Sequence, residues 1–273
     1  MKVFVQKEKL VSRQSMKARN LIGVVGGVGP HAGLDLVRKI FDQTVAGSDQ
    51  EHLSVALLSY PDRIEDRTSF IAGKSSTNPA YAIDAVLRDL ESLGASVAGI
   101  ACNAAHAPPI FGVIVEEMKK RNSNLKLLHI IEEVARCVQE SHPAIRRLGL
   151  IATLGTVRSK AYQGVFKEKG LQILLPDEEM QLNLIHRAIY DPGYGIKARS
   201  NPVTQQARHN LLDAITALQG RGAQAIILGC TEVPLAITEK RIGKTIMLDA
   251  SLIFARSLIR EANPHKLRPL DVP

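Results

Sequence analysis

The chain has 273 residues, of which 45% are hydrophobic and 23% charged, so it can form one large or two small globular domains. No apolar run reaches the roughly 18–20 residues of a membrane span, and no apolar signal segment opens the sequence, so we expect a cytoplasmic protein without a membrane partner. The formal net charge of +8 raises the question of nucleic acid, but tryptophan is absent and only 4% of residues are aromatic, so we expect no such partner.

The positive charge gathers at the N-terminus. Residues 1–19 contain six lysines or arginines against a single glutamate. We interpret this basic tail as a disordered leader, or as an extension upstream of a start at Met16. The three cysteines, Cys102, Cys137 and Cys230, are too few and too scattered for a disulfide framework, which also favours a reducing compartment.

From residue 21 the sequence alternates short apolar runs with amphipathic segments of helical period. The apolar runs predict strands and the amphipathic segments predict helices. In chain order we predict a strand at 21–27, a helix at 33–46, a strand at 52–61, a helix at 78–94, and strands at 96–102 and 125–130. Because strands separated by helices form parallel units, this pattern indicates an α/β fold with a covered sheet.

The same order then returns in a second half. We predict a strand and Gly-containing turn at 146–156, a helix and strand within 159–176, a long helix at 201–222, a strand at 222–230, and a last strand and helix at 246–260. We therefore expect two similar Rossmann-like parallel-sheet domains related by a pseudo-two-fold axis, with the active site in the cleft between them. The expected limits are 20–130 plus 246–273 for the first domain and 131–245 for the second.

Two of the cysteines occupy equivalent places in the halves. Cys102 and Cys230 each end an apolar strand and each come eight residues after the glycine of a Gly-Ala pair, at Gly94 and Gly222. Ligands of parallel α/β sheets bind beyond the carboxyl ends of the strands. A helix that begins just after each thiol would lower its pKa. If the halves face each other, the thiols lie on opposite walls of one cleft.

Such a pair suits the inversion of a carbon centre. Inversion needs a base on one face of the carbon to remove a proton and an acid on the other face to return one. Thiols titrate close enough to neutral pH to serve as either, so a thiolate and a thiol can exchange roles with the handedness of the substrate.

Five short motifs carry a family resemblance: GVVGGVGP at 23–30, DRT at 66–68, CNAAH at 102–106, ATLGT at 152–156 and GCTE at 229–232. By their order and spacing, the chain resembles the aspartate/glutamate racemase superfamily from about residue 21 to residue 260, and within it the aspartate-racemase-like branch. The resemblance implies a cofactor-independent isomerase with two α/β domains and a thiol on each side of a central cleft.

The resemblance also implies roles for single residues. Cys102 and Cys230 match the two catalytic cysteines. Arg67 matches an arginine that holds a substrate carboxylate, a task that suits a bidentate guanidinium, and Lys197 matches a lysine that pairs with the distal carboxylate. Further substrate contacts are implied for the backbone of Gly27 and for Asn103, Ala104, Thr153 and Thr231.

Three positions depart from the family pattern. Ala104 stands where the family usually has threonine, so a hydroxyl worth about 0.5–1.5 kcal/mol to a bound substrate is missing. Val28 replaces a methionine of the first turn, and a second arginine, Arg63, precedes Arg67. Aspartate is the expected substrate, and these departures leave glutamate or a broader range open.

Two polar residues follow the thiols closely. His106 comes four residues after Cys102; it either stays neutral and hydrogen-bonds within its loop or helps to tune the thiol. Glu232 comes two residues after Cys230; it is either an acid at a helix N-terminus or a polar partner in the site. Both are auxiliary candidates.

Other readings of the motifs are weaker. Cys137 lies in an amphipathic helix and is interpreted as structural. There is no Cys-x-x-Cys or paired-histidine motif, so we expect no metal site. GVGPHA at 27–32 fits a loose dinucleotide fingerprint, but Pro30 interrupts the turn and Asp62 comes too late to bind a ribose, so we expect no cofactor.

These observations predict a PLP-independent racemase, with aspartate as substrate and the two cysteines as acid and base. Alternatives with the same fold are a glutamate or broad-specificity racemase, a hydantoin racemase, a maleate isomerase or a decarboxylase. A non-catalytic protein that binds a dicarboxylate or an amino acid is a further alternative. The family resemblance also allows a homodimer.

Overall fold

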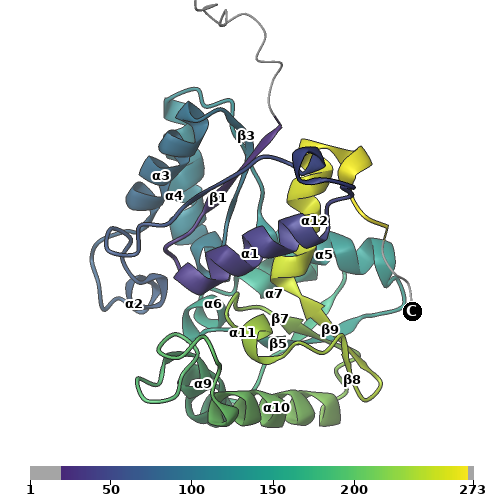
Figure 1. The fold of residues 1–273 in the computed structure, drawn as a ribbon. Helices are drawn as coiled ribbons and strands as arrows, with labels where there is room; N and C mark the ends of the chain where they lie inside the picture. Colours follow the sequence, from purple (N-terminus) through teal and green to yellow (C-terminus); the bar gives the residue numbers. More distant parts are fainter. Residues whose placement is uncertain (1–19, 270–273) are drawn as a thin grey trace, which may run out of the picture.

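The computed structural model describes residues 20–269, in which two sheets lie one above the other (Figure 1). The first sheet has four parallel strands in the order β2-β1-β3-β4. Its strands are β1 (Leu21–Val25), β2 (Val55–Leu58), β3 (Ala95–Ile100) and β4 (Lys126–Leu127). Three of these strands fall inside the ranges predicted for the first half, and β3 begins one residue before its predicted range of 96–102.

The second sheet has five strands in the order β6-β5-β7-β9-β8, all parallel except β8. Its strands are β5 (Arg147–Ile151), β6 (Gln172–Leu174), β7 (Ala225–Leu228), β8 (Arg241–Ile242) and β9 (Thr245–Asp249). The predicted α/β class with two parallel-sheet units is confirmed. The strand β8 was not predicted, because its two residues, unlike those of β4, do not stand in an apolar run.

Helices cover both sheets. In the first half they are α1 (Pro30–Asp42), α2 (Arg67–Ile71), α3 (Ala80–Ser92), α4 (Pro108–Lys120) and α5 (Ile130–Ser141), with the short 3-10 turns η1 (Asp49–Glu51) and η2 (Asn103–His106). In the second half they are α6 (Leu154–Arg158), α7 (Ala161–Glu168), α8 (Glu178–Met180), the π-helix η3 (Gln181–His186), α9 (Arg187–Tyr190), α10 (Gln205–Gly220) and α11 (Val233–Ala236). The chain ends with α12 (Ala250–Ala262) and η4 (Pro264–Lys266).

The last strand and the last helix belong to different halves of the fold, which corrects one predicted domain boundary. Residues 246–273 were expected to return to the first domain, yet β9 pairs with β7 in the second sheet. Only α12 returns, and it packs against β3, α1 and α5 (Figure 1). An apolar strand fits either sheet by composition, so the sequence did not reveal its partner.

Asp249 marks the point where the chain crosses from one half to the other. Its Oδ1 accepts a hydrogen bond of 3.0 Å from the backbone N–H of Leu252 and so caps α12. Its Oδ2 lies 2.6 Å from the ammonium of Lys39 on α1. In the first sheet, Gly99 of β3 leaves room for the ring of Phe254 on α12, because a Cβ on Gly99 would lie 2.6 Å from that ring. Capping and packing therefore hold α12 on the first sheet.

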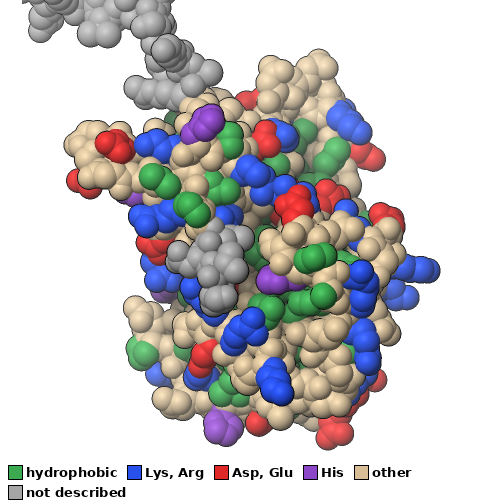
Figure 2. All heavy atoms as spheres, turned by 90° about the vertical axis from the view of Figure 1, so that its right-hand side faces the viewer, with side chains coloured by type: hydrophobic (Ala, Val, Ile, Leu, Met, Phe, Trp, Pro, Cys, Tyr) green, Lys and Arg blue, Asp and Glu red, His purple; other side chains and the backbone are tan. Residues whose placement is uncertain are grey.

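The outer face beside α12 is mixed in charge. Figure 2 shows lysine and arginine side chains spread over this face with acidic and hydrophobic groups among them. Between residues 20 and 269, no helix is both long enough and apolar enough to cross a bilayer. The predictions for the basic tail, residues 1–19, and for the last four residues of the expected first domain concern residues outside those that the structure describes.

Candidate active site

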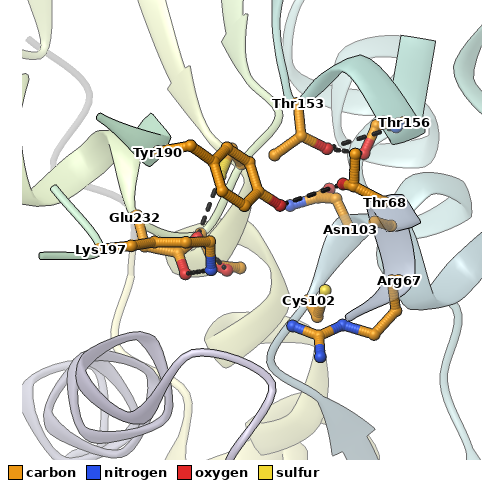
Figure 3. Close-up of a pocket in the computed structure, with 12 residues that line it drawn as sticks. Arg67, Thr68, Cys102, Asn103, Thr153, Thr156, Tyr190, Lys197 and Glu232 are labelled. Carbon is orange, nitrogen blue, oxygen red and sulfur yellow. Dashed lines mark hydrogen bonds and ion pairs between the residues drawn. The ribbon is translucent and has the colours of Figure 1, made fainter. Parts of the chain in front are cut away.

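The two strand-end cysteines face one cavity between the sheets. Cys102 follows β3 and Cys230 follows β7, so each lies at the carboxyl end of the strand that was predicted to carry it. Twelve residues line the cavity (Figure 3): Arg67, Thr68, Cys102, Asn103, Ala104, Thr153, Thr156, Tyr190, Lys197, Cys230, Thr231 and Glu232. They come from both halves of the chain, as the sequence repeat implied.

Arg67 is the cation beside Cys102 (Figure 3). It is only 7% exposed, and its guanidinium donates to the carbonyl oxygens of Val28 at 2.6 Å and Glu65 at 3.0 Å. Burial by itself lowers the pKa of Arg67, but the neighbouring Cys102 and Asp66 carry that pKa above its usual value. The Arg67 side chain is thus a fixed positive charge next to the first thiol.

The second thiol has an anionic neighbour instead. The Sγ–H of Cys230 donates to Oε2 of Glu232 at 3.0 Å. Burial raises the pKa of Cys230 well above its ordinary value, and the charge of Glu232 raises it further, while Lys197 opposes the shift. The expected lowering by a helix N-terminus is wrong for this thiol, because α11 is one turn long and its dipole is outweighed by burial.

Glu232 is a polar partner in the site. Its Oε1 pairs with the ammonium of Lys197 at 2.5 Å, and its side chain does not cap α11. Burial would raise the pKa of Glu232, but Lys197, Cys230 and Arg67 together outweigh burial and lower it, so the residue is a carboxylate. Oε1 also rests against Gly29, where a Cβ would lie 2.4 Å away, so the glycine turn of the first half closes over this ion pair.

Neutral hydrogen-bonding groups line the rest of the cavity. Asn103 accepts a hydrogen bond of 2.7 Å from the hydroxyl of Tyr162, whereas its buried Nδ2 has no partner among residues 20–269. Thr153 caps α6 through the backbone N–H of Thr156. Thr231 donates to the carbonyl oxygen of Ala101 at 3.1 Å and so ties the two halves together. Ala104 lines the wall without adding a polar group.

A wider groove opens outside the cavity and shares three of its residues, Arg67, Lys197 and Glu232. Gly27 lines this outer groove and not the inner cavity. Its φ of 73° lies in the left-handed region, and a Cβ would lie 2.6 Å from the backbone of Tyr60, so only glycine fits there. The glycine turn therefore lines the groove outside the cavity.

His106 lies behind Cys102 and does not line the cavity. Its Nδ1 is 2.8 Å from the carbonyl oxygen of Cys102, and its ring stacks on Phe111 and meets His129 edge-on. Burial, with the neighbouring His129, lowers the pKa of His106 well below its ordinary value, so the ring is neutral. Its contact is with the backbone of Cys102, which matches the first of the two expectations for this residue.

A sequence model of the Asp/Glu/hydantoin racemase family matches residues 25–255. The chain belongs to this family. Its fold is similar to that of Picrophilus torridus aspartate racemase, with 26% identity, a TM-score of 0.75 and coverage of 91% of this chain and 96% of the other.

Two further racemase-family folds extend this likeness. An aspartate racemase homologue from Pyrococcus horikoshii has 23% identity, a TM-score of 0.67 and coverage of 89% of this chain and 99% of the other. A glutamate racemase from Francisella tularensis has 17% identity, a TM-score of 0.63 and coverage of 93% and 84%. The likeness thus spans nearly the whole of each chain.

Three lining residues of this racemase-family cavity were not singled out from the sequence. Thr68 and Thr156 stand inside two of the family motifs, so their motif membership was a usable signal. Tyr190 ends α9 and carried no such signal, because it reaches the cavity only through the packing of η3 and α9 against α10. Its hydroxyl forms a hydrogen bond of 3.0 Å with Thr68.

Proposed function

We propose that the protein is a PLP-independent aspartate racemase in which Cys102 and Cys230 transfer the α-proton. One observation carries this proposal: two thiols on equivalent strand ends face one cavity, with Arg67 beside Cys102 and the ion pair of Glu232 and Lys197 beside Cys230. The reaction as proposed needs no cofactor, since side chains supply both the proton acceptor and the proton donor.

The charges of the cavity wall favour an anionic amino acid. Arg67 and Lys197 are cations and Glu232 is an anion, so these three side chains sum to one positive charge. Aspartate carries two carboxylates and one ammonium and is complementary to that wall. In the proposal, Arg67 and Lys197 bind the distal carboxylate of the substrate. The ion pair between Glu232 and Lys197 weakens when that carboxylate binds to Lys197.

The α-carboxylate is assigned to the neutral donors. The buried Nδ2 of Asn103 lacks a protein partner, and the hydroxyls of Thr153 and Thr231 lie on the same wall. Fixed donors of this kind stabilise the negative charge that develops on the carboxylate when the α-proton leaves, which is commonly the largest catalytic contribution. Holding the substrate at both ends also fixes the Cα between the thiols.

Proton transfer then follows from the two thiol environments. For one enantiomer, Cys102 acts as thiolate beside Arg67 and takes the α-proton as the Cα–H bond breaks. Cys230, whose S–H points to Glu232, gives its proton to the opposite face of the planar carbanion. The enzyme is left with a thiol at Cys102 and a thiolate at Cys230, and the other enantiomer uses this pair in reverse.

A chiral assay of L- and D-aspartate tests the proposal. The wild-type protein should form each enantiomer from the other, and Cys102→Ser and Cys230→Ser should each lower the rate about 10²–10⁴-fold. Cys137→Ser is the matched control, because Cys137 lies on α5 away from the cavity, and it should leave the rate unchanged. Lack of inversion by the wild type, or full activity in either active-site variant, would contradict the proposal.

A further inference from the structure

Tyr190 has the largest side chain on the cavity wall, and the structure pins it on several sides. Its hydroxyl forms a hydrogen bond of 3.0 Å with Thr68 of α2, in the other half of the chain, and lies 3.5 Å from Oδ2 of Asp66. The ring of His186 stacks on the Tyr190 ring, with 4.9 Å between centroids. The Tyr190 ring therefore cannot turn away from the cavity without breaking contacts in both halves.

Lys197 is a further neighbour of Tyr190. The ammonium of Lys197 lies 5.5 Å from the centroid of the Tyr190 ring, within cation–π range, and also pairs with Glu232 (Figure 3). The ring is thus the wall directly beside the cation that is assigned to the far carboxylate of the substrate.

We propose that the Tyr190 ring limits the length of the substrate side chain and so selects aspartate over glutamate. This inference rests on the proposed function. Glutamate is one methylene longer, so with its Cα between the thiols its far carboxylate would have to move toward the wall that Thr68 and His186 hold in place. A difference of one methylene in a shaped pocket changes the specificity ratio by about 10- to 200-fold.

Substitutions that separate ring size from the hydroxyl group test the inference. Tyr190→Leu and Tyr190→Met remove the ring, and Tyr190→Phe is the matched control that keeps the ring and loses only the hydrogen bond to Thr68. Racemisation of aspartate and glutamate is measured as kcat/KM for each variant. We expect Leu and Met to raise the glutamate-to-aspartate ratio about tenfold or more, and Phe to leave it within about threefold of wild type.

The possible outcomes separate this inference from the proposed function. If the wild type racemises aspartate but Leu and Met leave the ratio unchanged, the ring does not set the length. If Phe shifts the ratio as far as Leu, the hydroxyl and not the ring discriminates, which also overturns the inference.

If the wild type acts on neither amino acid, the proposed function fails, and calorimetric binding of succinate and glutarate then tests the ring alone. The wild type should bind succinate more tightly than glutarate, and the difference in affinity should be smaller in the folded Leu or Met variant. An unchanged difference in affinity would overturn the inference.

Discussion

Glu232 decides, at the scale of a single residue, how the second thiol holds its proton. It accepts the Sγ–H of Cys230 at 3.0 Å and pairs with Lys197 on its other oxygen. Burial is the main reason for the raised pKa of Cys230, and the carboxylate adds to it. Removing the charge while keeping the shape should therefore lower that pKa, because Lys197 then faces the thiol unopposed.

Glu232→Gln is expected to speed the alkylation of Cys230 by iodoacetamide, about tenfold for each unit by which the pKa falls. The rate at each cysteine is followed by mass spectrometry of the peptides, with Cys137 as the internal reference. Glu239→Gln is the control, because Glu239 pairs with Arg208 away from the cavity. An unchanged rate at Cys230 in Glu232→Gln would show that the carboxylate does not hold the proton in place.

The residues that the sequence located are those that adjoin a strand end or a motif. Cys102 and Cys230 could be placed at the cavity because the carboxyl end of a buried strand fixes where the next residues lie, whereas the roles of Asn103 and Thr231 were implied by the family resemblance. Lys197 was found only through the family resemblance. Tyr190 was missed, because its place depends on how a helix end packs against another half of the chain, which no local pattern encodes.

Among the elements, α2 of the first half packs against α6 of the second half. Gly155 of α6 leaves no room for a side chain, since a Cβ would lie 2.8 Å from Oγ1 and 2.9 Å from Cα of Thr68. Both helices begin at residues that line the cavity, Arg67 for α2 and the capping residue Thr153 for α6.

Gly155→Ala is therefore expected to push α2 and α6 apart, to destabilise the protein by about 1–3 kcal/mol and to lower activity. Gly164→Ala on α7 is the matched control: it adds the same methyl group where nothing lies within 4 Å, and should stabilise the helix by about 0.5–1 kcal/mol. Urea unfolding and the racemisation rate are measured for both. Full activity and stability in Gly155→Ala would mean that α2 and α6 accommodate the added methyl group without cost.

Element types followed from the sequence more readily than element partners. Apolar runs and amphipathic periods identified the main strands and helices of both halves, since burial on two faces or on one face leaves different patterns. The strand β9 was placed in the wrong sheet, because pairing with β7 is a long-range contact that a short apolar run does not specify. The helix expected after Cys230 is the single turn α11, and burial of the thiol outweighs any effect of its N-terminus on the pKa of Cys230.

Two neutral histidines, the buried His106 and the half-buried His129, couple the stability of the whole molecule to pH. Burial lowers the pKa of His106 and of His129 in the folded state. The unfolded chain, with histidine pKa values of about 6.5, binds more protons below that pH than the folded protein does. The stabilisation from these neutral rings is complete above about pH 6.5 and is lost as the pH falls toward the folded-state pKa.

We expect the free energy of unfolding to decrease between about pH 7 and pH 5, and His106→Asn to make that decrease shallower. Asparagine can keep an N–H near the carbonyl oxygen of Cys102 but does not titrate. His209→Asn, at an exposed position on α10, is the control and should leave the slope unchanged. Urea titrations across this pH range give the slopes; an unaltered slope in His106→Asn would exclude the buried ring as a source.

The central claim is that two thiols on opposite faces exchange the α-proton, and deuterium transfer tests it most directly. L-aspartate and D-aspartate are each incubated with the wild-type protein in D₂O, and the early product is examined by proton NMR after chiral separation. The account predicts that the inverted product carries deuterium at Cα, because its new proton comes from a thiol in exchange with solvent, while the remaining substrate keeps its original proton. Deuterium entering the substrate without inversion, or no deuterium in either enantiomer, would contradict the two-thiol account.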